Sequence, residues 1–81
     1  MVSAFHSRDY DVLRQVLLRA RLKGGLTQNL VATRLDKPQS YVSKYENGER
    51  RLDVIEFIRV CRAIGCSPSE ELIEVVKQAR L

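Results

Sequence analysis

The chain has 81 residues, of which 44% are hydrophobic and 30% charged, and its net charge is +4. So short a chain fills a single domain, 1–81, and its apolar content excludes a wholly disordered protein. No apolar run approaches the roughly 20 residues that span a bilayer. The first residues also lack the basic and apolar parts of a signal peptide, so we expect a cytoplasmic protein without a membrane partner.

Charge is distributed unevenly along the chain. Residues 1–52 hold ten Lys and Arg against five Asp and Glu, whereas residues 53–81 hold four against five. A basic part beside a neutral part suggests one face for a polyanion and another face for a different contact. Because many unrelated proteins are mildly basic, this asymmetry is informative only where the basic residues fall on suitable elements.

The first predicted helix covers residues 9–23. Along it, apolar residues recur at intervals of three and four, which places them on one face: Tyr10, Leu13, Leu17 and Ala20. Gly24 and Gly25 follow the last periodic residue and end the helix. The residues before it, 1–8, are expected to form a flexible N-terminal arm.

Two short helices with a tight turn between them are predicted over residues 27–47. Thr27 is a good N-cap for a helix that reaches Leu35. Three of its residues are expected to face the core: Val31, Ala32 and Leu35. Asp36 and Lys37 form the turn. Pro38 suits the first turn of the next helix, where a missing N–H costs nothing, and Gly48 supplies a left-handed exit after it. This spacing is that of a helix-turn-helix.

Two further helices complete an all-α domain of five helices. Asp53 and Glu56 predict a capping box, followed by an apolar stripe: Val54, Phe57, Ile58, Cys61 and Ile64. Ser67, Pro68 and Glu70 predict the start of a C-terminal helix over 67–81, with apolar residues on more than one face: Leu72, Ile73, Val75, Val76 and Ala79. That helix is a candidate dimer interface; the alternative is that all of these residues pack within the domain.

The third helix divides its residues into two faces. Pro38, Val42 and Tyr45 share the face expected to point into the core. The opposite face has only hydrogen-bonding side chains and no acidic one: Gln39, Ser40, Ser43, Lys44 and Asn47. Such a face can meet base edges in a major groove without repelling phosphate. The alternative is an ordinary solvated face, and the helix by itself does not decide between the two.

The wider sequence resembles a known family. Residues 26–32 read LTQNLVA, and residues 38–50 read PQSYVSKYENGER, with Leu35 between them and an Asp-led helix after them. In this order and spacing they resemble the Cro/repressor-type (Xre) helix-turn-helix family over residues 12–72. The resemblance implies a lambda-repressor-like domain with its recognition helix at 38–47. It also implies a bacterial, nucleoid-associated repressor that binds double-stranded DNA as a homodimer on a two-fold-symmetric operator.

The resemblance also implies roles for individual residues. Gln39, Ser40 and Lys44 match positions that reach base edges, and Ser43 lies on the same face and is grouped with them. A second set matches positions at the DNA backbone: Gln28, Tyr41, Asn47, Arg50 and Arg51. In relatives the residue at the Gln28 position also braces the first glutamine of the recognition helix. Arg21 and Glu46 match a structural ion pair between the first and third helices.

Two positions depart from the family pattern. Asp36 stands where glycine is usual in the turn, and we expect it to adopt the left-handed conformation at some cost in free energy. Leu30 stands where many relatives carry a polar residue. It either packs against the first helix or forms a small exposed apolar spot, and the sequence leaves both open.

Other functions find little support in the sequence. The single histidine, His6, has no nucleophile and acid with which to form a catalytic set, so we expect no enzyme. Cys61 and Cys66 lack zinc-site spacing and are expected to be reduced, with Cys61 in the core. We expect no metal, cofactor or small-molecule ligand. The alternative is a protein-interaction or antitoxin-type module, and repressor, activator and controller roles stay open.

Overall fold

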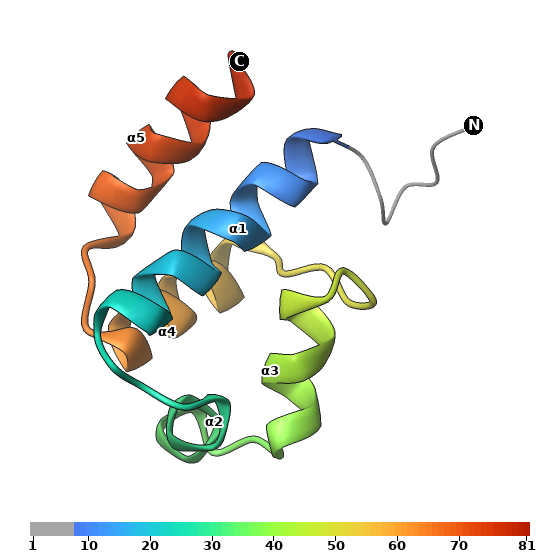
Figure 1. Ribbon diagram of the computed structural model, residues 1–81, viewed down its shortest axis with the longest axis vertical. Coiled ribbons are helices and arrows are strands. Elements are labelled where there is room, and N and C mark those ends of the chain that lie inside the picture. The colour runs from blue at the N-terminus through green and yellow to red at the C-terminus, as the bar shows by residue number, and fades with distance from the viewer. Residues whose placement is uncertain (1–7) are drawn as a thin grey trace.

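The computed structural model describes residues 8–81, and over this range the chain forms five helices and no strand (Figure 1). They are α1 (Arg8–Lys23), α2 (Gln28–Leu35), α3 (Gln39–Glu46), α4 (Val54–Ile64) and α5 (Pro68–Ala79). The predicted all-α, five-helix architecture is confirmed. The predicted N-terminal arm lies outside the described residues except for Arg8, which opens α1.

Side-chain caps begin three of these helices, as the sequence predicts. Thr27 Oγ1 accepts a hydrogen bond from Leu30 N at 3.1 Å. At α4, Asp53 Oδ1 accepts from Glu56 N at 2.7 Å and Glu56 Oε1 accepts from Asp53 N at 2.9 Å, which completes the capping box. At the start of α5, Ser67 Oγ accepts from Glu70 N at 3.3 Å. Each bond satisfies a backbone N–H that has no partner within its helix.

The turn between α2 and α3 takes the shape that its residues allow. Asp36 is left-handed at φ 57°, ψ 44°, as predicted for the position where relatives carry glycine. Gly48, at φ 86°, likewise supplies the predicted exit after α3. The prediction for Pro38 is wrong: it is the N-cap of α3, with extended backbone (φ −70°, ψ 156°), and it is exposed. Because an N-cap residue precedes the first helical turn, its ring does not join the inward stripe.

The core lies where α1, α2, α3 and α4 meet. These four helices carry the largest fully buried side chains: Leu17, Val31, Val42, Tyr45, Val60 and Cys61. The predicted stripe of α4 is partly wrong, because Val54 is 72% exposed and Val60 is fully buried instead. Val54 is the first residue of the helix, before the turn that packs, so the buried stripe is rotated towards Val60. Val16 on α1 is also buried and was not predicted.

Helix α5 lies along α1 and closes the domain on that side (Figure 1). Only Val75 of its apolar residues is buried, whereas Leu72, Ile73 and Val76 are about half exposed. Leu30, the undecided residue of α2, is 40% exposed, which favours the exposed apolar spot over packing against α1. None of the described helices is long and apolar enough to cross a membrane.

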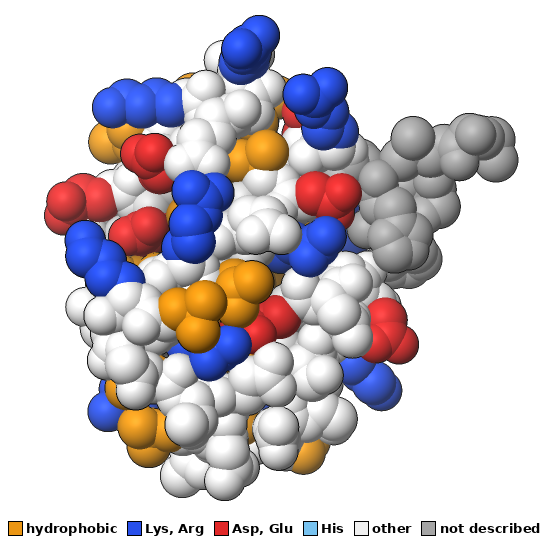
Figure 2. Space-filling view, viewed as in Figure 1, with side chains coloured by type: hydrophobic (Ala, Val, Ile, Leu, Met, Phe, Trp, Pro, Cys, Tyr) orange, Lys and Arg blue, Asp and Glu red, His pale blue; other side chains and the backbone are white. Residues whose placement is uncertain are grey.

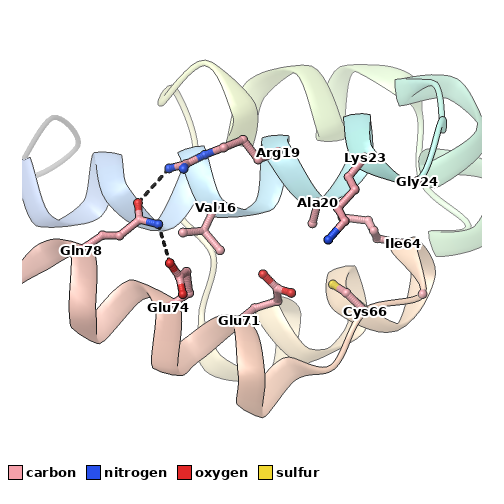
Figure 3. A pocket seen from close by; sticks show the side chains of 11 residues that line it. Val16, Arg19, Ala20, Lys23, Gly24, Ile64, Cys66, Glu71, Glu74 and Gln78 are labelled. Atoms are coloured by element: carbon pink, nitrogen blue, oxygen red, sulfur yellow. Dashed lines mark hydrogen bonds between the residues drawn. The ribbon is translucent and has the colours of Figure 1, made fainter.

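A cleft of about 500 Å³ separates part of α5 from α1 (Figure 3). Its two walls carry opposite charges, with Arg19 and Lys23 on α1 and Glu71 and Glu74 on α5. At one end a chain of hydrogen bonds ties the helices together, from Arg19 Nη2 to Gln78 Oε1 and from Gln78 Nε2 to Glu74 Oε1, both at 2.8 Å. Polar contacts therefore contribute to holding α5 in place.

Both cysteines are free thiols at the other end of this region. Cys61 is fully buried, as predicted, and Cys66 is half-buried at the edge of the cleft. Burial raises the pKa of both thiols, which disfavours the thiolate form of each. Among the described residues, no three His, Cys, Asp or Glu side chains are grouped so as to hold a metal ion.

Candidate nucleic-acid interface

Helix α3 presents an outward polar face. Val42 and Tyr45 are fully buried on its inner side, which orients the helix relative to the core. Gln39, Ser40 and Lys44 are consequently exposed, and Ser43 is half-buried between the two sides. In Figure 2 the surface over α2 and α3 is mostly uncharged polar side chain and backbone, whereas charged groups gather over α1 and α5. The arrangement offers hydrogen-bonding groups without an acidic side chain among them.

A buried ion pair ties α3 to α1. Arg21 Nε donates to Glu46 Oε2 at 2.6 Å and Arg21 Nη2 donates to Glu46 Oε1 at 3.0 Å. Arg21 is only 8% exposed and Glu46 only 6%. The hydrogen bonds that Arg21 donates to Glu46 raise the pKa of Arg21, so the guanidinium stays charged inside the domain. Arg21 Nη1 also donates to Leu26 O at 2.8 Å, which anchors the chain entering α2.

The same carboxylate continues into a chain of hydrogen bonds that reaches the outward face. Gln28 Nε2 donates to Glu46 Oε1 at 2.8 Å, and Gln39 Nε2 donates to Gln28 Oε1 at 3.3 Å. Since the carboxylate can only accept, it sets which end of the Gln28 amide faces it. Three predicted residues, Gln28, Gln39 and Glu46, are thereby brought together, with Gln28 between the ion pair and the exposed Gln39.

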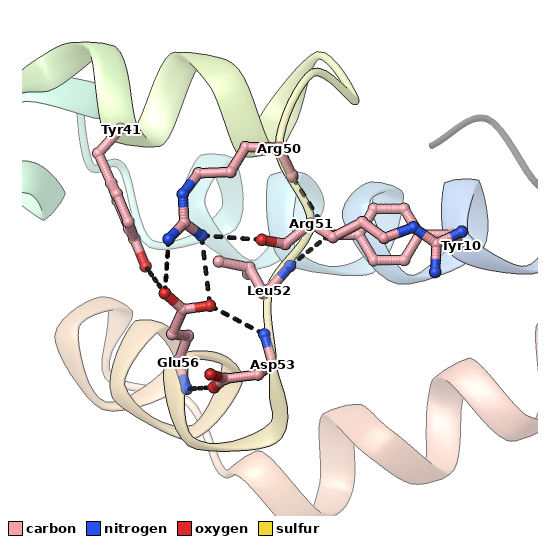
Figure 4. A network of polar contacts seen from close by, with 7 residues as sticks. All are labelled: Tyr10, Tyr41, Arg50, Arg51, Leu52, Asp53 and Glu56. Atoms are coloured by element: carbon pink, nitrogen blue, oxygen red, sulfur yellow. Dashed lines mark hydrogen bonds and ion pairs between the residues drawn. The ribbon is translucent and has the colours of Figure 1, made fainter. Parts of the chain in front are cut away.

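The loop after α3 is fastened by Arg50 (Figure 4). Arg50 Nη2 donates to Glu56 Oε2 at 2.7 Å, and Nη1 donates to the backbone oxygen of Arg51 at 2.8 Å. The Arg50 guanidinium also lies 4.6 Å from the centre of the Tyr41 ring. Hydrogen bonds from Arg50, and then from the Asp53 backbone, lower the pKa of Glu56 to about 2. The terminal nitrogens of Arg50 thus turn towards the protein, which its sequence-based role did not anticipate.

Glu56 has more partners than its predicted capping box requires. Besides closing the capping box, it accepts from Arg50 and from the hydroxyl of Tyr41 at 3.4 Å. Burial raises the pKa of Tyr41, whose ring also faces Lys37 Nζ at 5.5 Å. The spacing of the capping box predicts the Asp53 contact. No local pattern predicts that Tyr41 of α3 and Arg50 of the loop also bind this carboxylate.

Tyr10 holds the same loop from α1. Its hydroxyl accepts from Leu52 N at 2.9 Å and lies 3.4 Å from the backbone oxygen of Arg50, to which it donates. The Arg51 guanidinium lies 4.6 Å from the centre of the Tyr10 ring. The sequence placed Tyr10 only on the apolar stripe of the first helix, and its contact with Arg51 was missed. The residues are about 40 positions apart, so no spacing signal could have revealed it.

Asn47 lies at the C-terminal end of α3 and is exposed. Its Nδ2 donates to Glu49 Oε2 at 2.6 Å, while its Oδ1 accepts from Glu49 N at 3.1 Å. Asn47 thus closes a local turn with an acidic neighbour. Among the predicted backbone contacts, Asn47, Tyr41 and Arg50 all have intramolecular partners in this region.

Comparison with known proteins identifies the arrangement. The model of the helix-turn-helix family matches residues 17–70. An XRE-family like protein from Pseudomonas syringae pv. tomato str. DC3000 is 50% identical, with a TM-score of 0.83 over 86% of this chain and 85% of that one. The clp gene regulator ClgR from C. glutamicum is 25% identical, with a TM-score of 0.79 over 90% of this chain and 95% of that one. No curated protein matches the sequence.

A more distant likeness extends the comparison to a protein solved with DNA. The restriction-modification controller protein C.Esp1396I, a tetramer in complex with its natural 35 base-pair operator, is 20% identical and has a TM-score of 0.83. The match covers 94% of this chain and 100% of that one, and at this identity it shows the fold alone. The family model and the close structural relative, together with the geometry of α2 and α3, lead to one conclusion: this chain belongs to the Xre-type helix-turn-helix family.

Proposed function

We propose that this protein is a sequence-specific regulator of transcription that binds double-stranded DNA by inserting α3 into the major groove. The observation that carries the proposal is the support of Gln39: an exposed glutamine at the start of α3 is held by Gln28, which is held by the buried Glu46. A side chain that reads a base gains specificity when it is pre-positioned. Family membership supports the same function, as does the fold shared with a protein solved on its operator.

Four residues of α3 are proposed to read bases: Gln39, Ser40, Ser43 and Lys44. Glutamine can bond the N6 and N7 edge of adenine with both ends of its amide, and lysine donates to guanine O6 and N7. Lys44 and Gln39 are exposed on the outward face, so both can reach base edges without rearrangement of the helix. Ser43 is half-buried and is placed for a shorter reach than the other three.

Phosphate contacts are proposed for residues on either side of α3. The family resemblance implies this role for three residues near the two ends of α3, and we keep it in the proposal: Gln28, Tyr41 and Asn47. Of the two loop arginines, we assign the phosphate contact to Arg51, which is exposed. Arg50 turns its terminal nitrogens to Glu56 and to the Arg51 backbone, so its proposed role becomes the support of the loop.

We further propose that the protein is a homodimeric repressor that acts in the bacterial cytoplasm. One recognition helix contacts too few bases for tight specific binding, and two-fold symmetry doubles the contacts on a palindromic operator. The exposed apolar residues of α5, Leu72, Ile73 and Val76, supply a surface for a second copy. A dimer seated on an operator that overlaps a promoter would exclude polymerase, which suffices for repression.

Selection of bound sequences from a random duplex library tests the proposal. The expected result is an inverted repeat whose half-sites lie about one helical turn apart. A reporter with that repeat in its promoter should lose expression when the protein is present. Weak, salt-sensitive binding without any enriched sequence would overturn sequence-specific reading and favour the interaction or antitoxin-type module.

A further inference from the structure

Lys37 is an exposed cation in the turn between α2 and α3, two residues before Gln39. Its ammonium lies over the Tyr41 ring, with Nζ 5.5 Å from the ring centre, which is within the range of a cation–π contact. Within residues 8–81, no carboxylate lies within 4.0 Å of Lys37 as an ion-pair partner. The described part of the domain therefore holds this cation with an aromatic face and leaves its charge without a counterion.

The Tyr41 ring is itself fixed on several sides. It packs edge to face against the buried Tyr45, with 5.9 Å between the ring centres and 80° between the ring planes. Its hydroxyl donates to Glu56 Oε2 at 3.4 Å, and the Arg50 guanidinium lies 4.6 Å from the ring centre (Figure 4). Because groups of α3, α4 and the loop between them hold the ring, it offers the Lys37 side chain a fixed surface.

The two cations on this ring differ in how their charge is balanced. Arg50 donates to both oxygens of Glu56, at 3.3 and 2.7 Å, so its charge meets a carboxylate. Lys37 meets the ring instead. An ammonium has three N–H donors, and a ring that faces one side of it leaves the donors on the other side for an acceptor. Lys37 is thus the cation of the two that is available to an external anion.

Lys37 also lies beside the surface proposed to contact DNA. Gln39, at the start of α3, is proposed to read a base, and Tyr41 is proposed to lie at the DNA backbone. A helix in the major groove has a phosphate strand on each side, so a cation just before its first turn lies next to phosphates. Phosphate is therefore the external anion that this position fits best.

We propose that Lys37 is a further phosphate contact of this protein and that Tyr41 is its positioning residue. The inference rests on the proposed DNA binding by α3 and adds to it a contact in the turn before that helix. A long side chain that is held before binding loses less conformational entropy when it meets its partner. Removing the Tyr41 ring should therefore weaken binding to every duplex about two- to fivefold, without changing base preference.

Salt titration of DNA binding tests the phosphate contact of Lys37. Dissociation constants of the wild type and of Lys37→Ala are measured on the selected operator and on a scrambled duplex at a series of salt concentrations. Lys37→Ala should weaken binding to both duplexes alike and reduce the slope of affinity against salt by about one unit, whereas Lys37→Arg should keep the slope. Lys23→Ala, at an exposed lysine on the cleft wall of α1, is the matched control and should change neither affinity nor slope.

The support from Tyr41 is tested by comparing two variants that both lack its hydroxyl. Tyr41→Phe keeps the ring and Tyr41→Leu loses it, so any direct contact of the hydroxyl with DNA is removed from both. With Lys37 present, Tyr41→Leu should bind both duplexes about two- to fivefold more weakly than Tyr41→Phe. In a Lys37→Ala background the two should bind equally, whereas a Lys23→Ala background should keep the difference.

Folding is controlled in the same experiments. Binding is measured below the unfolding transition of every variant, so that loss of folded protein does not count as loss of affinity. If Tyr41→Leu fails to fold, Tyr41→Met, which also lacks a ring, takes its place in the comparison with Tyr41→Phe.

The outcomes separate the inference from the function on which it rests. A wild-type salt slope in Lys37→Ala would overturn the phosphate contact. An equal difference between Tyr41→Phe and Tyr41→Leu with and without Lys37 would overturn the positioning role of the ring. A wild-type protein that binds neither duplex would overturn the proposed function itself, whereas a selected operator that wild type and Lys37→Ala bind equally would overturn only the role of Lys37.

Discussion

Gln28 Nε2 lies 2.8 Å from Glu46 Oε1, and this hydrogen bond decides which way the Gln28 amide faces. The Glu46 carboxylate accepts a hydrogen bond from the Gln28 amide N–H. The Gln28 amide oxygen therefore faces Gln39 and accepts from Gln39 Nε2 at 3.3 Å. A buried charge pair inside the domain thereby orients a side chain at its surface.

The first prediction concerns reading by Gln39. Gln39→Ala should weaken operator binding by about 1–3 kcal/mol and relax the preference at one base pair. Gln28→Ala should relax the preference at the same base pair, because it removes the acceptor that holds Gln39. Competition binding against a set of single-base operator variants measures both. Gln15→Ala, an exposed glutamine on α1, is the control and should change neither affinity nor preference.

A second prediction concerns the buried pair of Arg21 and Glu46. Arg21→Met should lower the free energy of unfolding by about 3–5 kcal/mol, because it leaves a buried carboxylate without its partner. Urea unfolding at neutral pH measures the change. Arg19→Met, which removes an exposed arginine from the same helix, should cost less than about 1 kcal/mol. Equal losses for the two variants would contradict the structural role of the pair.

The third prediction is a pH dependence that arises from Glu56. Its pKa falls from 4.5 to about 2 in the folded protein, chiefly through its hydrogen bond with Arg50. A carboxyl whose folded pKa is depressed stabilises the protein above its unfolded pKa, and this stabilisation is lost as the pH falls between those two values. Glu56→Gln should therefore flatten the loss of unfolding free energy between about pH 4.5 and pH 2.

Urea unfolding at a series of pH values across that window checks the effect of Glu56. Because the Arg50 side chain is 38% exposed and that of Glu56 is 25% exposed, solvent screening makes the pair weaker than the pKa alone implies. Glu74→Gln, which removes an exposed carboxylate on α5, is the control and should leave the slope as in the wild type. An unchanged slope in Glu56→Gln would show that other carboxyl groups set the acid sensitivity.

The fourth prediction distinguishes the two loop arginines. Arg51→Ala should weaken binding to all duplexes alike and reduce the slope of affinity against salt by about one unit. Arg50→Ala should act mainly on stability, lowering the unfolding free energy by up to about 1 kcal/mol, since its half-exposed pair with Glu56 is lost. Salt titrations and urea unfolding of both variants make the comparison. The reverse pattern would return the phosphate contact to Arg50.

The fifth prediction concerns assembly. Ile73→Glu, at a position 55% exposed on α5, should leave the domain folded and prevent the proposed dimer by placing a charge in its interface. Sedimentation velocity gives the oligomeric state, and circular dichroism gives the helix content. Leu22→Glu, at a position 59% exposed on α1, is the matched control and should not change the assembly. A dimer that persists in Ile73→Glu would place the interface elsewhere.

The five helices and the turns between them follow from local patterns in the sequence. Helix starts depend on caps such as Thr27 and Asp53, whose partners lie three residues away, and exits depend on residues such as Asp36 that tolerate a left-handed backbone. These interactions are local, so the spacing of residue types reveals them. The polar face of α3 follows for the same reason, because helical periodicity separates it from the buried Val42 and Tyr45.

Which side chains of different helices contact one another depends on the tertiary fold. Packing rotated the buried stripe of α4 from Val54 to Val60, turned Arg50 towards Glu56, and brought Tyr10 beneath Arg51 across about 40 residues of chain. Each of these choices depends on which elements become neighbours when the core closes, and no residue carries that information in its local spacing. The sequence therefore predicts α3 and its polar face, whereas the contacts that hold its surroundings in place appear only in the folded domain.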